Sequence, residues 1–133
     1  MSEFHKISVI GLGLIGTSIL HAINAKKNDS ITTFAYDLNS KHRDIVSEMK
    51  IATFVCDKID DAIKEADLVI LAVPVGSMKS VAISISSSLK ESAVVTDTGS
   101  TKKSVMNDIN PHMPANINFI PSHPLAGTEY SGP

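Results

Sequence analysis

Two hydrophobic periods alternate along the chain. Short runs rich in β-branched residues, such as 31–36 and 93–97, are separated by longer segments whose apolar residues recur every three or four positions. The short runs indicate strands, and the longer spacing indicates amphipathic helices. Such alternation is typical of strand–helix–strand units, in which right-handed crossovers build an open parallel sheet. The pattern therefore predicts an α/β fold.

The predicted elements follow one another in strict alternation. We expect strands at His5–Ile10, Ile31–Tyr36, Ala52–Val55, Leu68–Ala72, Ala93–Asp97 and Asn118–Pro121. We expect helices at Leu14–Asn24, Lys41–Met49 (with Ser40 as N-cap), Ile59–Ala66, Ser77–Lys90 and Lys102–Asn110, and an irregular loop at His123–Pro133. The run Leu68–Ala72 is apolar throughout, as expected of a strand buried on both faces. Together these elements predict a Rossmann-type, doubly wound, mainly parallel sheet with helices on both faces.

Composition places the chain among ordinary globular domains. Its 133 residues suit one domain, and 43% hydrophobic with 20% charged residues argues against disorder. A net charge of −2 without a basic cluster argues against nucleic-acid binding. The single cysteine and the lack of a Cys/His set predict no intrachain disulfide and no metal site, and they suit a reducing cytoplasm. No segment reaches the ~20 apolar residues of a membrane helix, and we interpret the glycine-interrupted N-terminal apolar stretch as structure rather than a signal peptide.

A glycine-rich turn joins the first predicted strand to the first predicted helix. The sequence Gly11-Leu12-Gly13-Leu14-Ile15-Gly16 matches GxGxxG in the context that a dinucleotide fingerprint requires. Gly11 would allow a tight turn, Gly13 a close approach of the backbone to a pyrophosphate, and Gly16 close packing of helix on strand. The helix N-terminus would offer N–H groups to phosphates. The alternative is a plain Gly-rich turn.

Asp37 ends the second predicted strand, about 20 residues after Gly16. A carboxylate at this point can accept hydrogen bonds from the ribose hydroxyls of NAD and would repel the 2′-phosphate of NADP. We therefore predict NAD as cofactor, with NADP disfavoured. Lys41, His42 and Arg43 follow closely and could soften this preference. The alternative for Asp37 is a turn or capping aspartate.

Three later segments leave the carboxyl ends of predicted strands, where open α/β sheets bind ligands. Two of them carry Val73 and Pro74, and Thr98 and Gly99, which we expect to contact the dinucleotide. The third carries His123, which suits a general base for an alcohol dehydrogenation because histidine titrates near neutral pH. The Ser100 hydroxyl and the Glu129 carboxylate are expected to share its cleft. The alternatives are an ordinary loop histidine, a helix N-cap at Ser100 and a solvated charge at Glu129.

The motifs together resemble the prephenate dehydrogenase family, which includes arogenate and cyclohexadienyl dehydrogenases. The resemblance rests on GLGLIG near the N-terminus, AVP after a buried strand, TDTGSTK after the next strand, and SHPLAGTEYSGP at the end of the chain. It spans the whole chain, and HPLAGTEYSGP is its most specific part. The resemblance implies NAD-dependent oxidative decarboxylation of prephenate or arogenate in tyrosine biosynthesis.

The resemblance also implies roles for individual residues. His123 would take the proton of the ring hydroxyl as hydride moves to NAD⁺, and loss of the ring carboxylate as CO₂ would aromatise the ring. Ser100 would position that hydroxyl, the histidine and the nicotinamide. Gly127, Thr128 and Glu129 would border the substrate pocket. The glycine-rich turn and Asp37 would form the cofactor set.

The chain departs from the family in length. Family members resemble a two-domain protein of roughly twice this size, whose second, helical domain forms a homodimer and supplies arginines for the substrate carboxylates. We expect residues 1–133 to be the NAD-binding domain, to turn over little prephenate alone, and to self-associate weakly through exposed apolar surface. Two alternatives remain: a dehydrogenase of β-hydroxy-acid type, and a non-catalytic dinucleotide-binding module or relic. A flavodoxin-like domain is disfavoured because it needs no GxGxxG.

Overall fold

The structure is a computed structural model that describes residues 4–26, 28–99 and 102–121. Within these ranges the strands are β1 (Lys6–Ile10), β2 (Thr32–Tyr36), β3 (Phe54–Val55), β4 (Leu68–Leu71), β5 (Val94–Asp97) and β6 (Asn118–Phe119). The helices are α1 (Leu14–Ala25), α2 (Ser40–Met49), α3 (Ile59–Ile63), α4 (Met78–Ile85) and α5 (Lys102–Ile109), with short 3₁₀ turns η1 (Val75–Ser77) and η2 (Asn110–His112). No helix of the described segments is long and apolar enough to cross a membrane.

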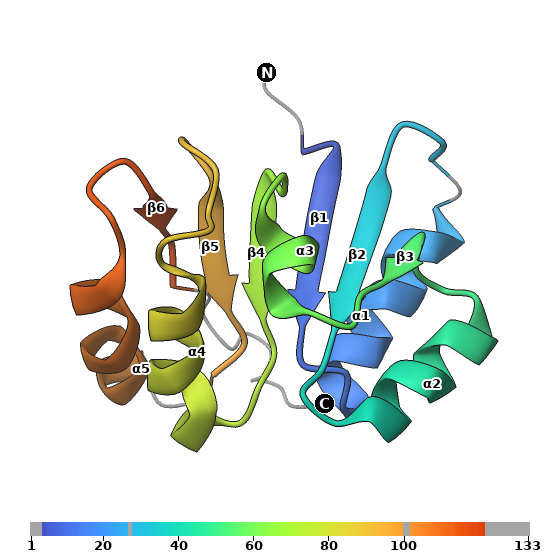
Figure 1. Cartoon of the computed structure of the whole chain (residues 1–133), viewed down its shortest axis with the longest axis horizontal. Helices are drawn as coiled ribbons and strands as arrows, with labels where there is room; N and C mark the ends of the chain where they lie inside the picture. The colour runs from blue at the N-terminus through green and yellow to red at the C-terminus, as the bar shows by residue number, and fades with distance from the viewer. Residues whose placement is uncertain (1–3, 27, 100–101, 122–133) are drawn as a thin grey trace, which may run out of the picture.

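The strands form one sheet in the order β3-β2-β1-β4-β5-β6, and every pairing is parallel (Figure 1). Chain order therefore runs outward from β1 to β3, returns to β4 beside β1, and runs outward again to β6. This reversal at the β1–β4 boundary is the topological switch point of a doubly wound sheet. The predicted Rossmann-type α/β fold is confirmed.

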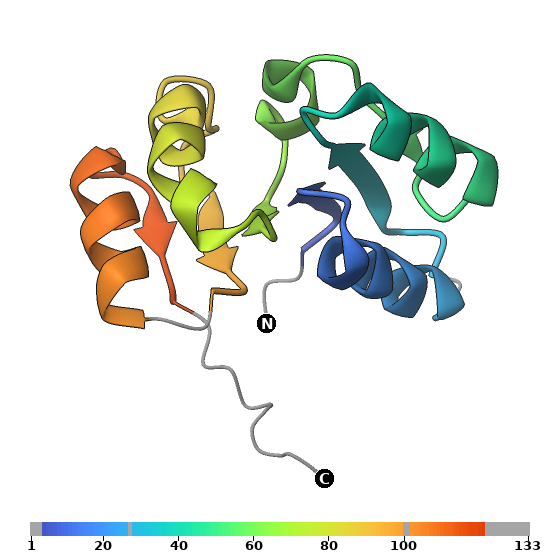
Figure 2. The same cartoon turned by 90° about the horizontal axis from the view of Figure 1, so that it is seen from below.

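Helices cover both faces of the sheet, with α1 on one face and α3 and α4 on the other (Figure 2). Neighbouring residues of β1 belong to different cores because side chains alternate along a strand. Val9 packs with Leu20 and Val46 from α1 and α2, whereas Ile10 packs in the larger cluster with residues of α3, α4 and α5. Ile70 of β4 packs against the first cluster and Leu71 belongs to the second, so both faces of β4 carry apolar contacts, although Leu68 and Ile70 are only half-buried where full burial was predicted.

Local hydrogen bonds explain three of the differences between the predicted and the observed helix boundaries. Asn39, not Ser40, is the N-cap of α2, because its side chain accepts the Lys41 N–H at 2.9 Å. Helix α4 ends at Ile85 rather than Lys90, where the Ser88 N–H closes a turn onto the Ile85 carbonyl and the Ser88 hydroxyl donates to Asp60. Helix α3 ends at Ile63 rather than Ala66, because the Ala66 N–H closes a tight turn onto the Ile63 carbonyl.

Strand β3 is also shorter than the predicted Ala52–Val55. The side chains of Thr33 and Thr53 replace strand pairing at this point. The Thr33 N–H donates to Thr53 Oγ1 at 3.0 Å, and the Thr53 N–H donates to Thr33 Oγ1 at 2.8 Å. Because each threonine hydroxyl accepts the backbone N–H of the other threonine, the backbone pairing between β2 and β3 begins only at Phe54.

Candidate functional site

The carboxyl ends of four strands lie in register. Ile10 of β1 pairs with Tyr36 of β2 and with Leu71 of β4, and Leu71 pairs with Asp97 of β5. The segments that follow these residues therefore leave the sheet at one edge, at the topological switch point, where open α/β sheets bind their ligands.

A cavity of about 720 Å³ opens at this edge. Predicted site residues that line it are Gly11, Gly13, Leu14, Ile15, Asp37, Val73, Pro74, Thr98 and Gly99. Most of the remaining wall is apolar, from Ile10, Leu38, Ile59, Ala72, Val75 and Val81, with Tyr36, His42, Ser77 and Ser80 as polar members. Two further predicted residues, Leu12 and Gly16, lie in the turn without lining the cavity. The structure thus brings the glycine-rich turn, Asp37 and the ends of β4 and β5 around one space.

The three glycines of the turn meet different surroundings. Gly11 has a φ of +103°, and a Cβ there would lie 2.7 Å from the Ala72 carbonyl. A Cβ at Gly16 would lie 1.8 Å from the Gly11 carbonyl oxygen, so only glycine lets α1 pack this closely on the turn. A Cβ at Gly13 would meet nothing within 4 Å. The protein itself therefore requires Gly11 and Gly16, whereas the space beside Gly13 is open.

The N-terminus of α1 faces the same cavity. Its N-cap, Gly13, supplies no side-chain hydrogen bond, and the first turn holds no acidic residue. The side chains of Leu14 and Ile15 are exposed, although both are large and apolar. The positive end of a 12-residue helix therefore faces a cavity without a side chain to cap it, which suits an anionic ligand.

Asp37 is bound to the glycine-rich turn. Its Oδ2 accepts the Leu12 N–H at 2.7 Å and lies 3.2 Å from His42 Nδ1, and its Oδ1 accepts the Asn39 N–H at 2.8 Å. Partial burial works to raise the pKa of Asp37, but these donors outweigh it, and the pKa lies below its ordinary value. The residue is thus a turn aspartate, the predicted alternative, and also an ionised carboxylate at the cavity wall.

The basic residues that follow Asp37 have different surroundings. Arg43 donates from Nη1 to the Asp37 carbonyl at 2.8 Å, and its guanidinium lies over the Tyr36 ring at 5.8 Å from the centroid. Arg43 therefore braces the end of β2. Lys41 is exposed and does not line the cavity, whereas His42 does.

Asp97, at the end of β5, is a buried polar residue that the sequence reasoning did not single out. Its side chain is fully buried, and Oδ2 accepts the Gly99 N–H at 2.7 Å. A Cβ on Gly99 would lie 2.5 Å from Val105 Cγ2. The hydrogen bond to Asp97 fixes the Thr98–Gly99 segment, and the lack of a Cβ at Gly99 lets this segment lie close to Val105 of α5. The signal in the sequence was a carboxylate closing an apolar strand directly before a Thr-Gly pair.

The predicted catalytic and substrate-binding residues lie outside the described residues. These are Ser100, His123, Gly127, Thr128 and Glu129. Their roles remain predictions.

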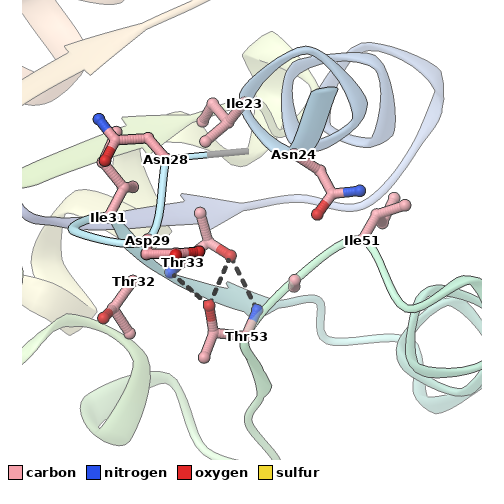
Figure 3. A pocket seen from close by; sticks show the side chains of 10 residues that line it. Ile23, Asn24, Asn28, Asp29, Ile31, Thr32, Thr33, Ile51 and Thr53 are labelled. Atoms are coloured by element: carbon pink, nitrogen blue, oxygen red, sulfur yellow. Dashed lines mark hydrogen bonds between the residues drawn. The ribbon is translucent and has the colours of Figure 1, made fainter. Parts of the chain in front are cut away.

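A second, smaller cavity of about 340 Å³ lies at the opposite edge, around the amino ends of β2 and β3 (Figure 3). Asn24 and Asn28 contribute polar groups to its wall. Thr33 and Thr53 also line it, and their hydroxyls are engaged in the mutual hydrogen bonds that shorten β3. No predicted site residue reaches this cavity.

A family model and curated relatives point to the same family. A family model, described as "Prephenate dehydrogenase, nucleotide-binding domain", matches residues 22–133. Cyclohexadienyl dehydrogenase of Zymomonas mobilis is 44% identical over 133 residues, which are 100% of this chain and 45% of that protein. Prephenate dehydrogenase of Lactococcus lactis is 33% identical over 96% of this chain and 36% of that protein.

A solved structure supports the same assignment. Prephenate dehydrogenase from A. aeolicus, in complex with hydroxyphenyl propionate and NAD⁺, has a TM-score of 0.80 and 27% identity over 99% of this chain and 45% of that one. The chain thus spans less than half the length of these relatives. From its sequence and its fold, the chain belongs to the prephenate dehydrogenase family, in which it matches the nucleotide-binding domain.

Proposed function

We propose that this chain binds NAD⁺ and forms the cofactor-binding part of an enzyme that oxidatively decarboxylates prephenate or arogenate. The observation that carries the proposal is the cavity at the carboxyl edge, where the glycine-rich turn, Asp37 and the ends of β4 and β5 meet. The relatives named above are dehydrogenases of this substrate class, and the A. aeolicus structure holds NAD⁺.

The residues present fit a dinucleotide. The open space beside Gly13 and the uncapped start of α1 suit a pyrophosphate, because N–H groups and the helix dipole favour negative charge there. The ionised Asp37 at the cavity wall suits the ribose hydroxyls. The apolar walls around Val73 and Val81 suit flat rings. NAD⁺ would therefore lie across the switch point, with its nicotinamide towards β4 and β5.

The chemistry follows from the family resemblance. When bound, NAD⁺ would supply the hydride acceptor for the carbon that carries the ring hydroxyl, and the ring carboxylate would leave as CO₂. His123 would take the proton of that hydroxyl, and Ser100 would position it. Gly127, Thr128 and Glu129 would border the substrate. We further propose that residues beyond those of this chain hold the two substrate carboxylates and form the dimer.

The substitution Gly13→Ala tests cofactor binding without disturbing the fold. We expect Gly13→Ala to weaken NADH binding at least tenfold, because the added methyl occupies the space proposed for the pyrophosphate. Its melting temperature should change by no more than a few degrees, because the methyl meets no protein atom within 4 Å. NADH fluorescence titration and thermal circular dichroism measure the two effects.

Gly76→Ala is the matched control. A Cβ at Gly76 also meets nothing within 4 Å, and Gly76 does not line the cavity. We expect this variant to bind NADH as the wild-type chain does. Unchanged NADH binding in Gly13→Ala, or equal losses in the two variants, would contradict the proposed pyrophosphate position. A wild-type chain that binds no NADH would contradict the cofactor itself.

A further inference from the structure

Of the three basic residues Lys41, His42 and Arg43, only His42 is placed to meet a nucleotide. Arg43 is held against the backbone of Asp37 and Leu38 and over Tyr36, with its side chain 18% exposed. Lys41 does not line the cavity. The His42 ring lines the cavity wall, is 44% exposed, and lies 3.2 Å from Asp37 Oδ2. The first turn of α2 therefore presents an imidazole beside the carboxylate proposed to bind the ribose.

Asp37 Oδ2 interacts with two groups: it accepts the Leu12 N–H, and it lies 3.2 Å from Nδ1 of the His42 ring. While the carboxylate is ionised, it attracts the His42 Nδ1–H. The 2′-phosphate of NADP would reach the same place, where it would be repelled by Asp37 and attracted by the ring N–H. Carboxylate and phosphate therefore compete for one imidazole.

We propose that His42 is a second specificity-determining residue, a 2′-phosphate ligand that Asp37 keeps occupied. This inference rests on the proposed function, because it assumes that a dinucleotide places its adenosine ribose beside Asp37. Asp37 disfavours NADPH in two ways, by repelling the phosphate and by engaging the ring that would bind it. Removing the charge of Asp37 would end the repulsion of the phosphate and would free the ring to bind it. The gain in NADPH binding from the freed ring depends on His42.

A double-mutant cycle tests this dependence. The proteins are the wild-type chain, Asp37→Asn, His42→Ala and the double variant, each titrated with NADH and with NADPH by fluorescence. Asparagine retains an oxygen that can accept one of the two backbone N–H groups, and alanine suits the helical position of His42. Lys41→Ala in the Asp37→Asn background is the control, because Lys41 is the exposed cation beside His42.

We expect the wild-type chain to prefer NADH. Asp37→Asn should raise the ratio of NADPH to NADH affinity about tenfold, the size of one charge-assisted hydrogen bond. The double variant should lose most of that gain, whereas the Lys41 control should keep it. A gain of equal size in the double variant, or one that disappears with Lys41 instead, would overturn the inference.

Two further readouts keep the test decisive. Should Asp37→Asn fail to fold, Asp37→Ser takes its place, and adding His42→Ala to that variant is expected to weaken NADPH binding threefold or more while NADH binding changes less than twofold. Equal changes for both nucleotides would overturn the role of His42. A wild-type chain that binds neither nucleotide would overturn the proposed function along with this inference. If the chain binds NADH but its NADPH affinity does not depend on His42, the inference is overturned and the proposed function stands.

Discussion

Asp67 joins the amino ends of three strands, and its replacement by asparagine should destabilise the fold in a pH-dependent way. Its Oδ2 accepts the N–H groups of His5 and Lys6, each at 2.9 Å, and its Oδ1 accepts the Lys90 ammonium. Its backbone carbonyl accepts the Val94 N–H at the start of β5. An asparagine would turn its amide donors towards either the backbone N–H pair or Lys90, and both of these are donors.

The pKa of Asp67 gives the size of the effect. Burial acts to raise that pKa, but Lys90 and the two N–H groups outweigh burial and hold it at about 2, against an ordinary 3.8. The difference corresponds to at most about 2.5 kcal/mol, because one pKa unit is about 1.4 kcal/mol. Since the side chain is 22% exposed, solvent screens the interactions, and we expect a loss of about 1–2 kcal/mol in the free energy of unfolding.

Urea unfolding at pH 6 and pH 3 measures both the loss and its origin. Folding lowers the pKa, so the carboxylate stabilises the chain fully above about pH 5, and this contribution is lost as the pH falls through 3.8 towards 2. The gap between wild type and Asp67→Asn should therefore shrink by about half at pH 3. Asp44→Asn, at an exposed aspartate of α2, is the control and should change stability by less than about 0.5 kcal/mol. A gap that is the same at both pH values would refute the reasoning.

Two other predictions concern the turn and the reaction. Gly16→Ala places a methyl 1.8 Å from the Gly11 carbonyl oxygen, so it should lower the melting temperature by many degrees and abolish NADH binding; a melt like that of wild type would contradict this close packing. The 133-residue chain alone should bind NADH yet show no steady-state reduction of NAD⁺ with prephenate at 340 nm, because we propose that residues beyond it hold the substrate carboxylates. Measurable turnover would show that this chain suffices.

The sequence allowed the fold to be predicted where a single physical signal dominated. The β4 run is apolar along its length, and the glycine-rich turn follows a strand pattern and opens a helix pattern, so the alternation of elements and the doubly wound topology could be predicted. Boundaries were harder, because side-chain hydrogen bonds decide them. Nothing in the local pattern said that Thr33 and Thr53, 20 residues apart, would exchange hydrogen bonds and shorten β3. Nor did it say that Ser88, in the turn after α4, would bond to Asp60 of α3.

The candidate site shows the same division between residues that a motif predicts and contacts that only the fold creates. GxGxxG and a carboxylate at the end of β2 are sequence signals, but the bond from the Leu12 N–H to Asp37 joins segments 25 residues apart. That bond links the turn proposed to bind phosphates directly to the carboxylate proposed to bind the ribose. Substitutions at Asp37 should therefore act on the glycine-rich turn as well as on ribose recognition. A cofactor-specificity change at Asp37 must accordingly be judged by the ratio of NADPH to NADH binding, since loosening the turn would weaken both nucleotides alike.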